Sequence, residues 1–281
     1  MKKHIFGGMW TQKKLAILRS YLEFYVNALK DQRFKLIYID AFAGTGRCTI
    51  KIRGNEQTIP GSASIALDIA PPFEELIFIE KKARHVHQLQ ELLRGHPIGK
   101  RATIFRGTAE QNLENILAGQ NWRNTRGVLF LDPYGLQCDW ETVKRIAATK
   151  ALDVFFLVSL SGMYRQATNN LRDVDDDKRQ SLTRFLGTAD WEKDLYSIQT
   201  DLFGDKESLR HANPEALAEY MQARLQQVFA KVTKPIILYH EDAQGRRGAP
   251  LYALFFAVSN PSRKAVELAS RVSKEIMSKL Q

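Results

Sequence analysis

One stretch near the N-terminus constrains the fold more than any other: residues 36–46 read Leu-Ile-Tyr-Ile-Asp-Ala-Phe-Ala-Gly-Thr-Gly. An apolar run that ends in an acid and breaks into a turn of small residues is typical of the first strand and ligand loop of a doubly wound α/β sheet. In such a sheet the ligand lies beyond the carboxyl ends of the strands. Gly44 and Gly46 let the backbone approach that ligand closely, and Asp40 either contacts it or caps the next helix.

Four later apolar runs repeat this pattern, and helical periodicity separates them. Two of these runs end in an acid as well, at Glu80 and Asp132. Strands that alternate with helices predict parallel βαβ units with right-handed crossovers. The four runs are 75–80, 102–105, 127–132 and 152–158.

The last two apolar runs, 235–239 and 251–258, are joined by too short a connection for a crossover. They are therefore expected to be antiparallel neighbours. Together with the earlier runs they predict an α/β fold whose parallel strands are followed by a C-terminal antiparallel hairpin.

The other segments are expected to complete a single domain over residues 1–281. Apolar spacings of three and four predict a helix over 10–30, with Thr11 as its N-cap. The polar segment 47–60 predicts a long loop on the ligand side. Residues 161–213 predict a small helical insertion over the ligand face, in which the acidic cluster 173–177 caps a helix N-terminus.

Composition narrows the partners and the compartment. The net charge of +10 and the pI near 9.5 favour a polyanionic partner, with nucleic acid first. Two cysteines cannot form a disulfide framework, which favours a reducing, cytoplasmic setting. The N-terminal residues lack the apolar core of a signal peptide. An anionic membrane ranks second to nucleic acid as the polyanion. No apolar run approaches the length of a membrane-spanning helix, so no spanning helix is expected, and no membrane is predicted among the partners.

The motifs at the strand ends resemble those of class I S-adenosylmethionine-dependent methyltransferases, a Rossmann-like fold. Residues 38–46 look like the family's first motif, which implies that Asp40, Phe42, Gly44 and Gly46 form a cofactor loop. Glu80 matches the acid that holds the two ribose hydroxyls. Thr108 and Ala109 occupy the position near the adenine, where the family often has an acid before the small residue. The resemblance implies S-adenosylmethionine as the cofactor.

Asp132-Pro133-Tyr134-Gly135 resembles the fourth motif of amino-methyltransferases that act on adenine N6 or guanine N2. Asp132 and the Pro133 carbonyl would accept the two N–H bonds of an exocyclic base amine, whose lone pair is delocalised into the ring. Tyr134 would stack on the base, a contact that contributes roughly 1–3 kcal/mol. The alternatives are structural: Asp-Pro-Tyr-Gly also suits a type I or II turn, and Tyr134 would then pack under the loop.

The wider arrangement looks like the bacterial three-Cys-motif partner protein family (TcmP), whose members are encoded beside a protein with three cysteines in a radical-enzyme-like motif. This resemblance implies such a protein as partner and supplies no substrate. It leaves two hypotheses open: an N-methyltransferase, or a non-catalytic accessory subunit with the methyltransferase fold. The matching segments are 10–11, 38–46, 61–62, 78–80, 131–135 and Trp191.

Several basic residues are candidates for substrate contact. Arg165 follows the fifth strand, whereas Arg246 and Arg247 lie in the late hairpin, where they either bind phosphate or form a charged loop end. Cys138 lacks the preceding proline that is typical of cytosine-C5 methyltransferases. The six histidines show no metal-ligand spacing, so no metal is expected. A phosphate-binding P-loop is absent from the sequence, which disfavours a nucleotide triphosphatase.

Overall fold

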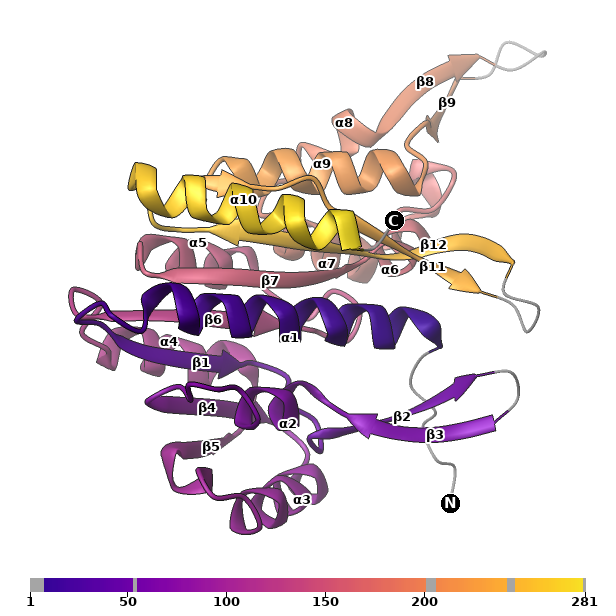
Figure 1. Cartoon of the computed structure of the whole chain (residues 1–281). Helices are drawn as coiled ribbons and strands as arrows, with labels where there is room; N and C mark the ends of the chain where they lie inside the picture. Colours follow the sequence, from indigo (N-terminus) through magenta and orange to yellow (C-terminus); the bar gives the residue numbers. More distant parts are fainter. Residues whose placement is uncertain (1–7, 53–54, 201–205, 242–245, 280–281) are drawn as a thin grey trace.

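The computed structural model describes residues 8–52, 55–200, 206–241 and 246–279. Its centre is an eight-stranded sheet in the order β10-β12-β7-β6-β1-β4-β5, with β11 paired to β12 (Figure 1). The strands are β1 (Lys35–Asp40), β4 (Glu75–Glu80), β5 (Ala102–Arg106), β6 (Thr125–Leu131), β7 (Leu152–Ser159), β10 (Lys231–Val232), β11 (Ile236–Glu241) and β12 (Arg247–Val258).

Strand directions confirm the predicted fold class. The five strands β5, β4, β1, β6 and β7 are parallel neighbours, whereas β12 is antiparallel to β7 and to β11. Parallel strands followed by an antiparallel hairpin are the layout that the methyltransferase resemblance implied, a Rossmann-like α/β sheet. Asp40 is level with Phe130 of β6 and Phe78 of β4. The turns that follow these three strands therefore begin at one edge of the sheet.

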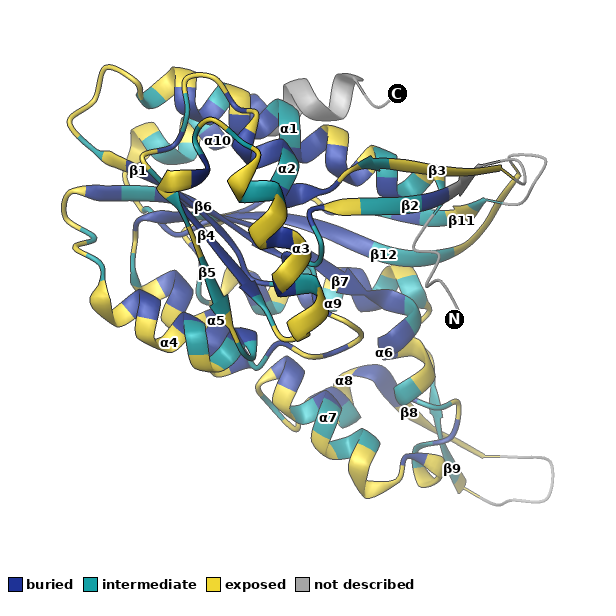
Figure 2. Cartoon of the chain, turned by 90° about the horizontal axis from the view of Figure 1, so that it is seen from below, coloured by how far each residue is buried: buried dark blue, intermediate teal, exposed yellow. Residues whose placement is uncertain are grey.

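Helices cover both faces of the sheet (Figure 1). In β1, Ile37 and Ile39 join one core cluster, and Leu36 and Tyr38 join the other, as the two-residue period of a strand requires. Burial on both faces explains why the central strands read as continuous apolar runs (Figure 2). The first cluster faces α4 (Ala109–Gly119), α5 (Trp140–Ala148), α6 (Leu160–Gln166), α7 (Asp176–Leu186), α8 (Trp191–Leu195) and α9 (Pro214–Gln226); the second faces α1 (Met9–Leu29), α2 (Ser62–Leu67), α3 (Ala83–Arg94) and α10 (Arg263–Lys279).

The expected loop at 47–60 is wrong: the segment forms an antiparallel hairpin of β2 (Arg47–Ile52) and β3 (Asn55–Pro60). Ile50 is fully buried while most residues of β3 are exposed. The hairpin pairs with itself and projects beyond the carboxyl end of the sheet (Figure 1), so most of its residues stay polar and give little strand signal.

The N-cap assigned to Thr11 is also wrong. Helix α1 begins at Met9, after Gly8, and the Thr11 amide donates to the Gly8 carbonyl at 3.0 Å. Thr11 therefore lies within the first helical turn, with a side chain that is only 3% exposed.

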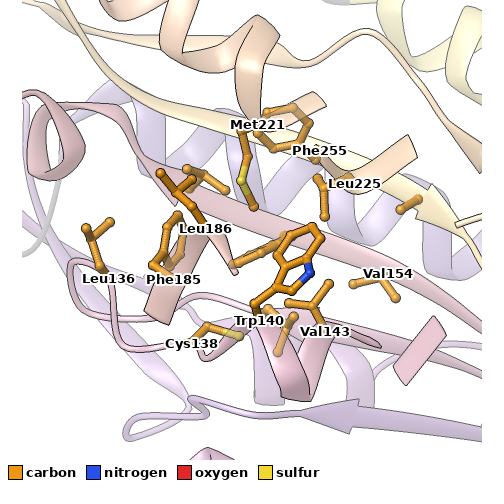
Figure 3. Packing of buried hydrophobic residues seen from close by; sticks show 14 of the residues in the cluster. Leu136, Cys138, Trp140, Val143, Val154, Phe185, Leu186, Met221, Leu225 and Phe255 are labelled. Carbon is orange, nitrogen blue, oxygen red and sulfur yellow. The ribbon is translucent and has the colours of Figure 1, made fainter. Parts of the chain in front are cut away.

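The segment 161–213 contains the expected helices and one unexpected hairpin. Asp175 accepts a hydrogen bond from the Lys178 amide at 2.9 Å at the start of α7, which confirms the predicted acidic cap. Phe185 and Trp191 belong to the first core cluster, and α7 packs beside α5 and α6 (Figure 3 shows Phe185 of α7 and Trp140 of α5 in this cluster). The 3₁₀ turn Leu171–Asp173 precedes α7, and β8 (Tyr196–Thr200) and β9 (Lys206–Arg210) form the hairpin.

Candidate functional site

The candidate site lies where β1, β4 and β6 end. The Ala41 amide donates to the Phe130 carbonyl at 3.1 Å, and the Ala43 amide donates to the Ile79 carbonyl at 3.0 Å. These bonds connect the turn after β1 to both neighbouring strands. The three acids that the sequence places at strand ends therefore belong to one edge.

Asp40 lies beneath the glycine loop and has no exposed surface. Its carboxylate accepts a hydrogen bond from the Phe42 amide at 3.2 Å and interacts with the Ser62 hydroxyl. The pKa of Asp40 is raised to about 7: burial is the largest cause and the Asp132 carboxylate adds to it, while Ser62, Phe42 and Lys14 act in the lowering direction. Asp40 thus shapes the loop from inside the protein.

The two glycines of the loop have different surroundings. Both have a positive φ, 61° at Gly44 and 76° at Gly46. A Cβ at Gly44 would meet no atom within 4 Å, whereas one at Gly46 would lie 2.5 Å from the Leu92 side chain. The Gly46 carbonyl also accepts from the Ser64 hydroxyl at 2.6 Å. Gly44 therefore borders open space, and Gly46 is required by packing against α3.

Glu80 is tied to the same loop. One of its carboxylate oxygens accepts from the Gly44 amide at 3.0 Å, and the other accepts from the Lys82 amide at 2.7 Å. His85 Nδ1 lies 3.5 Å from the carboxylate. Each carboxylate oxygen has two lone pairs, so two further hydroxyl donors can be accepted.

Thr108 and Ala109 begin α4, next to the end of β5. The Thr108 side chain is the N-cap and accepts from the Gln111 amide at 3.4 Å, while Ala109 is buried. The Gly107 amide donates to the Glu80 carbonyl at 3.2 Å, which places this turn beside β4. The structure thus gives Thr108 a capping role at the start of α4.

Asp132 forms an ion pair with Lys14 of α1, a residue that the sequence analysis did not identify. Lys14 is only 5% exposed, and its ammonium lies 5.3 Å from the Trp10 ring centroid and 5.8 Å from that of Phe130. The available signal was its spacing: Lys14 precedes Leu18 by four residues, which places it on the buried face of the helix.

Pro133 and Tyr134 differ in exposure. Pro133 is buried, whereas Tyr134 is 48% exposed and has the Lys82 ammonium 5.2 Å from its ring centroid. The pKa of Tyr134 is raised to about 12, mainly by burial and to a smaller extent by the Glu80 and Asp132 charges. The phenol therefore lies near two acids that the sequence analysis assigned to different roles.

The three candidate substrate arginines occupy two places. Arg165 is exposed on α6, after β7. Arg246 and Arg247 are exposed where β12 begins in the β11–β12 hairpin. The Arg247 guanidinium lies 3.2 Å from the Tyr239 ring centroid. This hairpin projects on the carboxyl side of the sheet, as does β2–β3 (Figure 1).

The described residues give little support to a cysteine nucleophile or a metal site. Cys138 is buried, and burial raises the pKa of its thiol far above the usual range, so the reactive thiolate is disfavoured. Among the described residues, no three His, Cys, Asp or Glu side chains are grouped as metal ligands. None of the described helices is both long and apolar enough to cross a membrane.

Comparison with solved structures finds similar chains at low sequence identity. No family model and no curated protein match the sequence. A Legionella pneumophila protein is 12% identical, with 93% of this chain and 90% of that chain covered and a TM-score of 0.48. The CcbJ methyltransferase from Streptomyces caelestis is 15% identical, with 86% of this chain and 88% of that chain covered and a TM-score of 0.38. The glycopeptide N-methyltransferase MtfA, complexed with S-adenosyl-L-homocysteine, is 12% identical, with 85% of this chain and 89% of that chain covered and a TM-score of 0.34. The resemblance to the three-Cys-motif partner family stays a prediction.

Proposed function

We propose that this chain is an S-adenosylmethionine-dependent methyltransferase whose acceptor is an exocyclic amine of a nucleic-acid base. The observation that carries the proposal is the meeting of the Gly44 loop, Glu80 and the Asp132 turn at one edge of the sheet. A cofactor loop and an amine-binding turn must be adjacent for methyl transfer, because the reaction depends on alignment of the two reacting groups.

The residues at the loop suit this cofactor. A Cβ at Gly44 would enter the open space that a ligand can occupy. Two backbone amides fix the Glu80 carboxylate, whose remaining lone pairs can accept two ribose hydroxyls. S-adenosylmethionine would supply the electrophilic methyl group. Asp40 would contribute by holding the loop in shape through Phe42 and Ser62.

The acceptor amine would be held by the Asp132 turn. One oxygen of Asp132 pairs with Lys14, which leaves the other to accept an amine N–H. The Pro133 carbonyl would accept the second N–H, and the exposed ring of Tyr134 would stack on the base. The basic net charge of +10 supports nucleic acid as the carrier of that base.

A calorimetric titration with S-adenosylmethionine tests the cofactor half of the proposal. Glu80→Ala should abolish measurable binding, while Glu75→Ala should not, because Glu75 lies at the opposite end of the same strand, in an ion pair with Lys35. A folded wild-type protein that does not bind the cofactor would contradict the proposal.

Incubation with labelled cofactor and separate pools of DNA and RNA tests the acceptor half. Label should enter one pool and should be lost in Asp132→Ala. Cofactor binding without label in either pool would favour the second candidate, a non-catalytic subunit with a three-cysteine protein as partner. The buried Lys14–Asp132 ion pair is the observation that favours that candidate, because it occupies part of the amine-binding group.

A further inference from the structure

A pair of aromatic side chains, one from near each end of the chain, lies near the Asp132 turn. Trp10, in the first turn of α1, and Tyr252, in β12, have ring centroids 4.6 Å apart at an interplanar angle of 30°. Both side chains are half-buried. Tyr252 is level with Ser159, the last residue of β7, so the pair lies at the carboxyl edge of the sheet.

Lys14 connects this pair to Asp132. Its ammonium lies 5.3 Å from the Trp10 ring centroid while it pairs with the Asp132 carboxylate. Burial raises the pKa of Tyr252, and the Asp132 charge raises it further. Tyr134 follows Asp132 by two residues, so Tyr134 and the Trp10–Tyr252 pair both adjoin the Lys14–Asp132 ion pair.

The charges at this centre favour one class of acceptor. Lys14 is buried and already neutralises Asp132. An alkylammonium acceptor would bring a second positive charge beside Lys14, and like charges repel strongly where water is excluded. A flat ring with an uncharged amine meets no such repulsion, and it can stack on the aromatic side chains near this ion pair.

We propose that Tyr134 and the Trp10–Tyr252 pair bound an acceptor slot that selects an uncharged heteroaromatic ring bearing an amine and excludes cationic amines. The inference rests on the proposed function and adds two specificity residues, Trp10 and Tyr252, to its site. Lys14 is a positioning residue that acts through Asp132.

Tryptophan fluorescence tests the slot without cofactor and without catalysis. Single-stranded oligonucleotides of six nucleotides, each with one base type, are titrated beside an abasic oligonucleotide with the same phosphates. Base-containing strands should quench the fluorescence, and the abasic strand should not. The quench should disappear in Trp10→Phe and persist in Trp122→Phe, a matched control whose indole donates to the Leu117 carbonyl at the far edge of the sheet.

Tyr252 gives a second arm that separates stacking from folding. Tyr252→Leu should weaken binding of base-containing strands by roughly 5- to 100-fold, the range expected for loss of one stacking contact. Tyr252→Phe keeps the ring and should bind as the wild type does. Equal binding of abasic and base-containing strands, or a quench that survives in Trp10→Phe, would overturn the slot.

Competition tests the exclusion of cations. 9-Methyladenine should displace a quenching strand, whereas benzylamine, which is flat but cationic, should not at the same concentration. The difference should shrink in Lys14→Met. Displacement by benzylamine equal to that by 9-methyladenine in the wild type would overturn the charge argument. A quench without methyl transfer would count against the proposed reaction and leave the slot intact.

Discussion

Asp40 and Asp132 end neighbouring parallel strands in the same sequence pattern, yet the structure treats them differently. Asp40 has no exposed surface and interacts with the Phe42 amide and the Ser62 hydroxyl. The Asp132 side chain keeps 28% of its surface exposed and pairs with a buried lysine. Asp40 is thus enclosed beneath the loop, whereas Asp132 is partly exposed and ion-paired.

The difference shows that the position of an acid after a strand does not determine its role. What decides the role is the element that covers it. Helix α2 begins next to Asp40 and supplies Ser62, whereas Asp132 is reached from α1 by the long side chain of Lys14. The covering elements are distant in sequence from Asp132 and close to Asp40.

The largest effect on stability is expected when the Asp132 carboxylate is removed. Asp132→Ala should lower the free energy of unfolding by about 4 kcal/mol, because it leaves the Lys14 ammonium buried without its partner. Urea unfolding monitored by circular dichroism measures the loss. Lys14→Met combined with Asp132→Ala should recover most of it, and simple addition of the two single losses would contradict the coupling.

The second prediction concerns pH and the Asp40 side. Native Asp40 has a pKa of about 7 against an ordinary value of 3.8. Between pH 4 and 7 the native state keeps a proton that the unfolded chain has released, so stability falls as pH rises through this window and levels off above it. Asp40→Asn should reduce that fall by about 3 kcal/mol between pH 4.5 and 8.

Urea unfolding at several pH values measures the fall for the wild type and for Asp40→Asn. Burial also raises the pKa of Asp153 to about 7, but Asp153 is present in both proteins, so its contribution cancels in their difference. Identical pH profiles for the two proteins would refute the assignment of this titration to Asp40.

The third prediction sharpens the contrast within the loop. Gly44→Ala should cost about 1 kcal/mol from its positive φ, and Gly46→Ala should cost about 2 kcal/mol because the new Cβ also meets Leu92. Cofactor affinity measured by calorimetry should show the reverse order, with the larger loss in Gly44→Ala. Equal affinity losses would mean that both glycines face the ligand.

The smallest effect is expected at Lys13, the neighbour of Lys14. Its ammonium pairs with Glu241 at 3.1 Å, but its side chain is half-exposed. Lys13→Met should change the free energy of unfolding by less than about 0.5 kcal/mol. In the same urea experiments it serves as the control for Lys14→Met, and a loss comparable to that of Lys14→Met would remove the distinction between the two lysines.

The sequence predicted the sheet well because the central strands are buried on both faces. Their apolar runs match β1, β4, β5, β6 and β7 closely, and the antiparallel end was evident from its short connection. It failed at 47–60 and at β8–β9, since each hairpin forms a separate two-stranded sheet with few buried residues among those described. Local polarity there resembles that of a loop.

The candidate site was predicted where its residues follow strands directly. Glu80, Gly44 and the Asp132 turn lie together as their strand positions indicated. Three residues near the site were missed because they come from the two ends of the chain, far in sequence from Asp132. They are Trp10, Lys14 and Tyr252. Helical spacing placed Lys14 on a buried face but did not identify its partner.

The sequence by itself determined the strands, their order of appearance, and the three acids and two glycines at their ends, because these depend on local periodicity and turn chemistry. Only the tertiary structure decided which acid is enclosed and which faces the site, which glycine borders open space, and which cation neutralises Asp132. Those outcomes depend on the packing of α1, α2, α3 and β12 around the loop, and packing joins residues that no local pattern connects.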